Sequence, residues 1–316
     1  MLEKQEIKRY KSIPQQLLMM RWIVLLPVFI VFISGCTVPG LEMLFPSQGV
    51  TYEGSIDVIV INSLTPVPAT VQSGQSTTLY ADVQNLQEPG KEPIYVDVEL
   101  YDYCKNLFKL EDEPKYISER LSPQQVKTFK WRLTAEKDIN LKTTCVMKVR
   151  VIYSYKTDVV TQISFMNKDE LESRIRRGET WRIPPAAPTV GEGPVKPYLV
   201  VEEQQPIPVD PMADETARIS MQIKNVGSGF ISGDGRIDQN KIEIETLPQD
   251  LRWDEEDCSW PFREENGVEL IKKESAKRFC EIEPSQVEIQ KTYTLKGWVE
   301  YTYEFRKETN VIVSPD

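Results

Sequence analysis

Apolar and polar residues alternate along most of this chain, in short runs that are typical of half-buried β-strands. In the first half the runs are Ile56 to Ile61, Thr77 to Val83, Tyr95 to Tyr103, Val126 to Leu133, Cys145 to Tyr155 and Thr157 to Phe165. Turn residues separate them. Because alternation implies one solvated face, this set of short strands indicates an antiparallel β-sandwich.

The same pattern resumes after residue 197. The second set of runs is Tyr198 to Val201, Ala217 to Ile223, Lys241 to Thr246, Glu269 to Lys272, Arg278 to Ile282, Thr292 to Phe305 and Thr309 to Val313. We therefore expect an all-β protein with two tandem immunoglobulin-like antiparallel β-sandwiches, residues 54–166 and residues 198–316.

Residues 167–197, between the two strand sets, are predicted to form one short helix and an interdomain linker. Asn167 can cap the helix, Glu170 stands at the capping-box position, and Gly178 suits the residue that follows the helix end. The stretch from Ile183 to Pro197 is rich in proline and glycine, which favours a semi-rigid spacer.

The N-terminal region has a different pattern, a single apolar run from Trp22 to Cys36 that follows a basic segment. Residues 1–21 hold five basic and two acidic residues, a net charge of +3, so the rest of the chain carries −10 − 3 = −13. A basic leader before an acidic chain is typical of export across the cytoplasmic membrane. We interpret residues 1–36 as a signal peptide or membrane anchor and residues 37–53 as a tether.

The end of the apolar run, Ile33-Ser34-Gly35-Cys36, resembles the lipobox of bacterial and archaeal lipoproteins. The resemblance implies cleavage before Cys36 and a lipid on its thiol. The alternative is an uncleaved anchor, in which residues 17–38 stay in the membrane. Both interpretations make the membrane a partner and place the protein on the outer face of the cytoplasmic membrane or at the cell surface.

Short segments recur at similar spacing in the two halves, which predicts an internal repeat. Ala81 to Asn85 matches Met221 to Asn225, 140 residues later. Val151 to Tyr155 (VIYSY) matches Val299 to Tyr303 (VEYTY), 148 residues later.

The repeated segments also carry a family resemblance. Leu79 to Asn85 and Ile219 to Gly229 resemble the second strand and the following turn of CARDB-like and related immunoglobulin-like domains of prokaryotic surface proteins. The resemblance implies a prokaryotic, archaeal-like surface lipoprotein with two such domains, a spacer or adhesion role, and no catalytic residues. The first copy departs from the pattern at its turn.

Composition argues against several classes of function. The chain contains no histidine, which removes the commonest general base and the commonest metal ligand. We expect no enzyme, no catalytic residues, no bound metal and no cofactor. The acidic balance of the exported part argues against a nucleic-acid partner, since phosphate binding needs a basic surface.

The chain has five cysteines. Four of them fall two in each half, and we expect the disulfides Cys104–Cys145 and Cys258–Cys280. The alternative is a four-thiolate zinc site, which the absence of a CxxC spacing disfavours. Cys36 is then the odd thiol, at the position where a lipid is expected.

Two acidic segments are candidate sites. The loop from Gly233 to Asn240 could hold a cation, but a turn stabilised by Asp and Gly fits it better. The segment from Asp254 to Asp257, between Trp253 and Trp260, could bind a cation or a sugar, or form a solvated loop. Trp131 and Trp298 are expected in the core.

These features favour a non-enzymatic, membrane-anchored extracytoplasmic protein. We expect a surface structural or adhesive module, or one that binds a protein partner. The alternative is an accessory subunit that docks on a membrane protein complex through its acidic face or through exposed strand edges.

Overall fold

The structure is a computed structural model of the chain. It describes residues 51–52, 57–111, 114–183, 187–210, 216–244, 250–253 and 267–315, and residues 49–316 form one compact unit. The anchor with Cys36 and the tether up to residue 50 lie outside the described residues. No helix in the part of the chain that the structure describes is long and apolar enough to cross a membrane.

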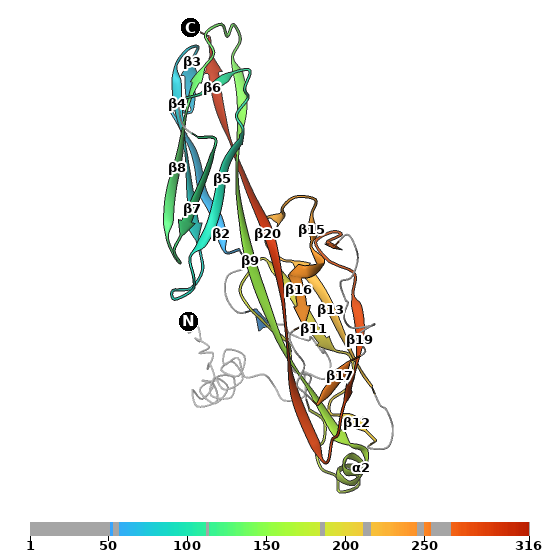
Figure 1. Cartoon of the computed structure of the whole chain (residues 1–316). Coiled ribbons are helices and arrows are strands. Elements are labelled where there is room, and N and C mark those ends of the chain that lie inside the picture. The colour runs from blue at the N-terminus through green and yellow to red at the C-terminus, as the bar shows by residue number, and fades with distance from the viewer. Residues whose placement is uncertain are drawn as a thin grey trace, which may run out of the picture. The chain divides into compact units, whose positions relative to one another are not determined.

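The predicted all-β class is confirmed, with mostly antiparallel sheets and, among the described residues, one short α-helix (Figure 1). The strands of the first half are β1 (Thr51–Tyr52), β2 (Ile59–Val67), β3 (Thr70–Gln72), β4 (Ser76–Asn85), β5 (Ile94–Asp102), β6 (Phe108–Leu110), β7 (Tyr116–Leu121), β8 (Val126–Ala135) and β9 (Thr143–Asn167). After them come α2 (Lys168–Arg176), β10 (Thr189–Val190), β11 (Val195–Val201), β12 (Ile207–Val209), β13 (Ala217–Asn225), β14 (Phe230–Ile231), β15 (Arg236–Ile237), the 3₁₀ turn η1 (Gln239–Lys241), β16 (Ile242–Ile244), β17 (Leu251–Trp253), β18 (Val268–Glu269), β19 (Arg278–Pro284) and β20 (Gln290–Ser314).

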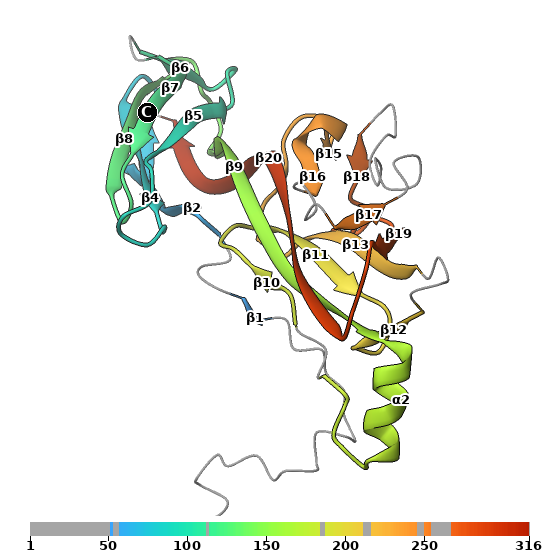
Figure 2. The same ribbon diagram turned by 60° about the horizontal axis from the view of Figure 1, so that its bottom comes forward.

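Two strands, β9 and β20, run through both halves of the molecule. They pair antiparallel from Gln290 opposite Met166 to Val313 opposite Thr143 (Figures 1 and 2). At a rise of about 3.3 Å per residue, each 25-residue strand is roughly 80 Å long. The sequence pattern indicated separate strands here, with breaks after Tyr155 and Phe305. The structure has none. Lys156, Asp158, Arg306 and Glu308 lie along the exposed side of continuous strands, while Lys307 points to the other side and donates to carbonyls of β2.

The predicted internal repeat has a counterpart in the strand order. One four-stranded sheet has the order β2-β4-β8-β6, and a second has the order β11-β13-β19-β17. The short strands β3 and β12 occupy matching places, since β3 pairs parallel with the end of β20 and β12 pairs parallel with the end of β9. Each repeat therefore ends in a long strand that also pairs with strands of the other repeat: β9 pairs with β10 and β12, and β20 pairs with β3. The domain limits expected from the sequence stay a prediction.

The segment expected to be a spacer takes part in the sheets. Val190 pairs with Val159 through β10, and Val195 opens β11 beside Asn225. Val190 and Val195 are fully buried. The proline and glycine content of this segment indicated a linker, but its valines pack into the core.

The core contains the apolar side of each strand, and Trp131 is fully buried in it. The Trp131 indole N–H donates to the carbonyl of Pro114 at 3.2 Å. Trp298, also expected in the core, is only half-buried. It lies on the outer face of β20, where the Lys156 ammonium is 4.2 Å from its ring centroid.

The helix α2 begins where the sequence predicts it. The Asn167 side chain accepts hydrogen bonds from the backbone N–H groups of Asp169 at 2.9 Å and Glu170 at 3.4 Å. Leu171 is buried, whereas Ile175 is exposed one turn later. The helix follows directly on the C-terminal end of β9 (Figure 2).

Candidate binding face

A cluster of arginine and aromatic side chains lies on the outer face of the sheet that contains β9 and β20. We call Tyr101, Arg150, Phe230, Glu304 and Arg306 the arginine–aromatic cluster. The Arg306 guanidinium carbon is 4.4 Å from the Phe230 ring centroid and 5.4 Å from the Tyr101 centroid. The Arg150 guanidinium carbon is 5.6 Å from the same Tyr101 centroid.

A buried carboxylate holds the two arginines of the cluster in place. The Glu304 side chain is 3% exposed, and its oxygens lie 2.5 Å from Arg306 Nε and 3.7 Å from Arg150 Nη1. Because a buried charge is costly unless it is paired, both arginines contribute to keeping this carboxylate in the fold.

Glu99 of β5 extends this network across the sheet. It lies opposite Arg150 in the strand register, and Arg150 Nη2 is 2.5 Å from one of its oxygens. Lys115 lies 2.6 Å from the other oxygen. Burial raises the pKa of the Glu99 carboxyl, but the hydrogen bonds from Lys115 and Arg150 outweigh burial and hold its pKa below the ordinary value.

This composition fits protein recognition better than catalysis. Arginine and aromatic residues are enriched at protein interfaces, where planar guanidinium groups stack on rings and pair with carboxylates. The charged groups of the cluster pair with one another, so they fix the geometry of a surface. Sequence reasoning did not find the cluster, because its members come from four strands or strand ends that only the fold brings together.

The loop from Gly233 to Asn240, a candidate from the sequence, forms one wall of a polar cavity of about 220 Å³. The cavity is lined by Ser154, Ile231, Ser232, Asp234, Arg236, Ile237, Asp238, Lys241, Glu300, Tyr301 and Thr302. Lys241 Nζ lies 2.5 Å from a Glu300 oxygen, and Asp234 accepts a hydrogen bond from the backbone N–H of Arg236 at 3.0 Å. Asp234 therefore stabilises a turn, as the sequence indicated.

No metal centre is formed by the residues that the structure describes. Among them, no three Cys, Asp or Glu side chains are grouped so that they could hold an ion. The second acidic candidate, Asp254 to Asp257 with Trp260, lies outside the described residues, and so does the side chain of Trp253.

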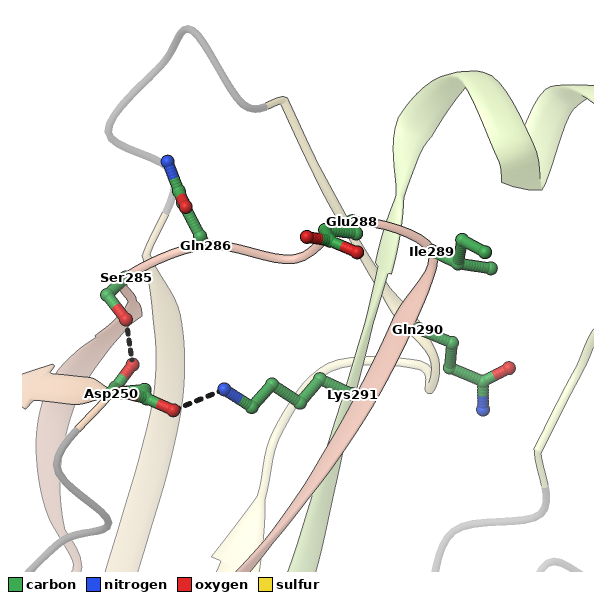
Figure 3. A pocket seen from close by; sticks show the side chains of 7 residues that line it. All are labelled: Asp250, Ser285, Gln286, Glu288, Ile289, Gln290 and Lys291. Atoms are coloured by element: carbon green, nitrogen blue, oxygen red, sulfur yellow. Dashed lines mark hydrogen bonds and ion pairs between the residues drawn. The ribbon is translucent and has the colours of Figure 1, made fainter.

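A larger, open cavity of about 500 Å³ lies at the turn between β19 and β20 (Figure 3). Its lining includes Asp250, Ser285, Glu288 and Lys291, and Asp250 forms an ion pair with Lys291. Ser285 donates a hydrogen bond from its hydroxyl to the Asp250 carbonyl at 2.8 Å. These contacts join the turn to the neighbouring strand, and the pocket offers polar contacts with few apolar ones.

The first of the two expected disulfides is present. Cys104 and Cys145 are bonded, with their Cα atoms 6.0 Å apart. Cys280 is buried in β19, whereas its expected partner Cys258 lies outside the described residues, so that pairing stays a prediction. Lipidation of Cys36 stays a prediction for the same reason.

Four tyrosines form a joint where the two repeats meet, a role that was not predicted from the sequence. In the β9–β20 ribbon Tyr153 lies opposite Tyr303, and Tyr155 lies opposite Tyr301. The ring centroids of the first pair are 5.8 Å apart and those of the second pair 6.3 Å. Burial raises the pKa of all four hydroxyls. These four residues are the tyrosine joint.

The hydroxyls of Tyr301 and Tyr303 bond to strands of the second repeat, whereas the Tyr155 hydroxyl accepts from the Gln87 side chain of the first repeat at 3.3 Å. The Tyr301 hydroxyl is 2.9 Å from the Thr157 hydroxyl and accepts from the Val195 backbone N–H at 3.4 Å. The Tyr303 hydroxyl donates to the side-chain oxygen of Asn225 at 3.0 Å. The joint therefore ties the long ribbon to β11 and to the end of β13.

Asn225 and its repeat counterpart Asn85 play the same local role. Asn85 accepts a hydrogen bond from the Gln87 backbone N–H at 2.9 Å, and Asn225 accepts one from the Gly227 backbone N–H at 3.1 Å. Both asparagines are buried at the ends of equivalent strands. The residues that reveal the repeat in the sequence are thus the ones that turn the chain after β4 and β13.

Comparison with known proteins adds little to this description. No family model matches the chain, and no curated protein matches it. Among solved structures, the chain has a TM-score of 0.12 and 7% identity to the C-terminal domain of the Streptococcus agalactiae AgI/II polypeptide BspA, over 78% of this chain and 93% of that one. A second chain, BspA_C_WT, gives a TM-score of 0.13 and 8% identity over the same shares. Similarity at this level carries no argument about the function of the present chain.

Proposed function

We propose that this protein is a membrane-anchored extracytoplasmic module that binds other proteins and catalyses no reaction. The Cys104–Cys145 disulfide carries the extracytoplasmic part of the proposal, because structural disulfides persist in oxidising compartments. It agrees with the basic leader, the apolar run and the lipobox-like end at Cys36. The CARDB-like resemblance of the two repeats is consistent with the same surroundings.

The arginine–aromatic cluster supports the binding part of the proposal. Phe230 is 39% exposed, and Arg306, stacked on it, is held by a carboxylate that is itself buried. A rigid, exposed ring beside a fixed guanidinium has the character of a protein-binding hot spot. The lack of histidine, the commonest general base, is the sequence feature that supports a non-catalytic role.

Mass spectrometry of the membrane fraction tests the anchor. Cleavage and lipidation predict an N-terminal peptide that begins at Cys36 and carries acyl chains. An intact peptide from Met1 through Gly35 in that fraction would rule out cleavage and leave the uncleaved anchor. Recovery of the whole chain from the cytosol would contradict both forms of the proposal.

The alternative, an accessory subunit of a membrane complex, predicts a different result after gentle detergent extraction. A subunit migrates with a fixed stoichiometry in a larger particle, whereas an adhesive module migrates alone. The Phe230→Ala variant should release the partner in the first case, since the ring lies on the proposed contact face.

A further inference from the structure

The strand register gives the direction from which the tether reaches the fold. β1 runs parallel to β10, with Thr51 opposite Thr189, and β10 runs antiparallel to β9, with Thr189 opposite Val160. β1 is therefore antiparallel to β9. The chain enters β1 from the side of the C-terminal end of β9, which is the end that α2 follows.

The length of the tether also favours the end of the molecule that carries α2. Residues 37–50 are 14 residues and span at most about 50 Å when fully extended. From Val160, at the register of β1, the C-terminal end of β9 at Asn167 is 7 residues away, or roughly 23 Å. The opposite end at Thr143 is 17 residues away, or roughly 56 Å. A membrane anchor at Cys36 can reach past α2 but cannot reach past Thr143.

The end of the molecule that carries α2 has the side chains of a lipid-contacting surface. Ile175 is 48% exposed and Ile289 is 58% exposed, and Ile289 is joined to the start of the helix because its carbonyl accepts the Asn167 backbone N–H at 2.9 Å. Trp181 follows the helix, and the Arg182 guanidinium carbon is 5.3 Å from its ring centroid. Tryptophan and arginine of this kind are typical of the interface between a membrane and water.

Charge sets this end apart from the rest of the exported part. Residues 168–182 hold five basic and four acidic residues, a net charge of 5 − 4 = +1, while the exported part as a whole carries −13. Arg176 and Arg182 are exposed. Glu288, exposed beside Ile289, offsets this charge, so the end is close to neutral while the exported part as a whole is acidic. A nearly neutral, apolar end is repelled least by an anionic lipid surface.

We propose that the α2 end lies against the lipid surface, with Ile175 and Ile289 among the lipid headgroups and Arg176 and Arg182 beside lipid phosphates. This inference rests on the proposed membrane anchor. It directs the first-repeat end of the ribbon, with the loop before Thr143, away from the membrane. The protein is thus held in one orientation by its own fold as well as by its tether.

Site-specific photocrosslinking tests the orientation. The full chain, with a benzophenone amino acid at position 175 or 289, is reconstituted into vesicles of phosphatidylcholine and phosphatidylglycerol at a ratio of 7 to 3, irradiated, and examined for lipid adducts by mass spectrometry. Position 141 is the matched control, because Leu141 is 77% exposed in the loop before β9. We expect adducts at 175 and 289 at least tenfold more often than at 141.

The outcomes separate this inference from the proposed function. Chains that float with the vesicles but give equal or fewer adducts at 175 than at 141 would overturn the orientation and leave the anchor standing. Chains that do not float with the vesicles would overturn the anchor itself. In the floating case, Arg176→Glu with Arg182→Glu should reduce the adducts at 175 in anionic vesicles but not in pure phosphatidylcholine, and an unchanged yield would contradict the contact with phosphates.

Discussion

Tyr303 of β20 lies directly opposite Tyr153 of β9, with their ring centroids 5.8 Å apart, at the point where one repeat passes into the other. The two hydroxyls differ. Tyr303 donates to Asn225, whereas the buried hydroxyl of Tyr153 makes no hydrogen bond of standard geometry with the described residues. This difference makes the tyrosine joint open to a direct test.

Removing each hydroxyl in turn should have opposite consequences. Tyr303→Phe loses a buried hydrogen bond and should lower the free energy of unfolding by about 1 kcal/mol. Tyr153→Phe removes a hydroxyl on which burial is the dominant influence and is little compensated, so stability should stay the same or rise. Urea unfolding monitored by circular dichroism measures both. A larger loss for Tyr153→Phe than for Tyr303→Phe would contradict the hydrogen bonds described for the joint.

The joint also predicts an alkaline limit of stability. Burial raises the pKa of Tyr153, Tyr155, Tyr301 and Tyr303 above the ordinary value in the folded state, while the unfolded chain ionises near pH 10. Their contribution is complete below pH 10 and is lost as the pH rises above it, because the unfolded state then releases protons that the folded state retains.

Absorbance of tyrosinate near 295 nm checks this expectation. Three of the 13 tyrosines, the buried Tyr153, Tyr301 and Tyr303, should fail to titrate until the protein unfolds, and Tyr155 should titrate with a pKa above the ordinary value. Titration of all 13 in a protein that keeps its circular dichroism spectrum would show that the joint is accessible to water.

The disulfide between Cys104 and Cys145 joins residues 41 positions apart. In the chain-entropy model a loop of this length stabilises the fold by about 4 kcal/mol, and native-state strain lowers that value. Thermal unfolding of the Cys104→Ser, Cys145→Ser variant should occur at a clearly lower temperature. Dithiothreitol should lower the unfolding temperature of the native protein by breaking this bond. The variant lacks the bond, so dithiothreitol cannot lower its unfolding temperature in this way. An equal temperature for both proteins would contradict a stabilising role.

The arginine–aromatic cluster predicts which surface substitution weakens partner binding. Phe230→Ala removes the ring on which Arg306 stacks and should reduce affinity for an identified partner about 30-fold, the effect of losing a hot spot worth about 2 kcal/mol. Tyr80→Ala is the matched control, because Tyr80 is 37% exposed against 39% for Phe230 and lies on a different sheet. Equal losses in the two variants would place the contact elsewhere.

The sequence predicted the strands and the helix but not how the strands are shared. Alternation reports which side of a strand is buried, and it holds for β4, β8 and β13 as expected. It does not report the partner of a strand, so β9 and β20 read as four strands. The predicted runs stopped at Phe305 and resumed at Thr309, leaving out Arg306, Lys307 and Glu308. In the fold Lys307 instead donates to the carbonyls of Ile61 at 3.0 Å and Asn62 at 2.6 Å, at an irregularity of β2.

Among the candidate sites, too, local features could be predicted from the sequence, whereas features that depend on strand pairing could not. The Asp234 turn could be predicted because its hydrogen bond is local, within two residues of the chain. The arginine–aromatic cluster could not, because Tyr101, Phe230 and Arg306 are far apart in the sequence and meet only through the pairing of β9 and β20. In the sequence, the tyrosine joint showed only as the match between the segments VIYSY and VEYTY. Its role in connecting the repeats follows from the antiparallel register of β9 and β20.

The central claim is that this protein works outside the cytoplasmic membrane while attached to it. Protease protection in intact cells that express the full chain measures both properties at once. We expect the chain to pellet with the membranes, and we expect a protease unable to cross the cytoplasmic membrane to digest it once any outer envelope is opened. A chain that stays intact until the cytoplasmic membrane is lysed, or that is recovered in the soluble fraction before any protease is added, would contradict the account.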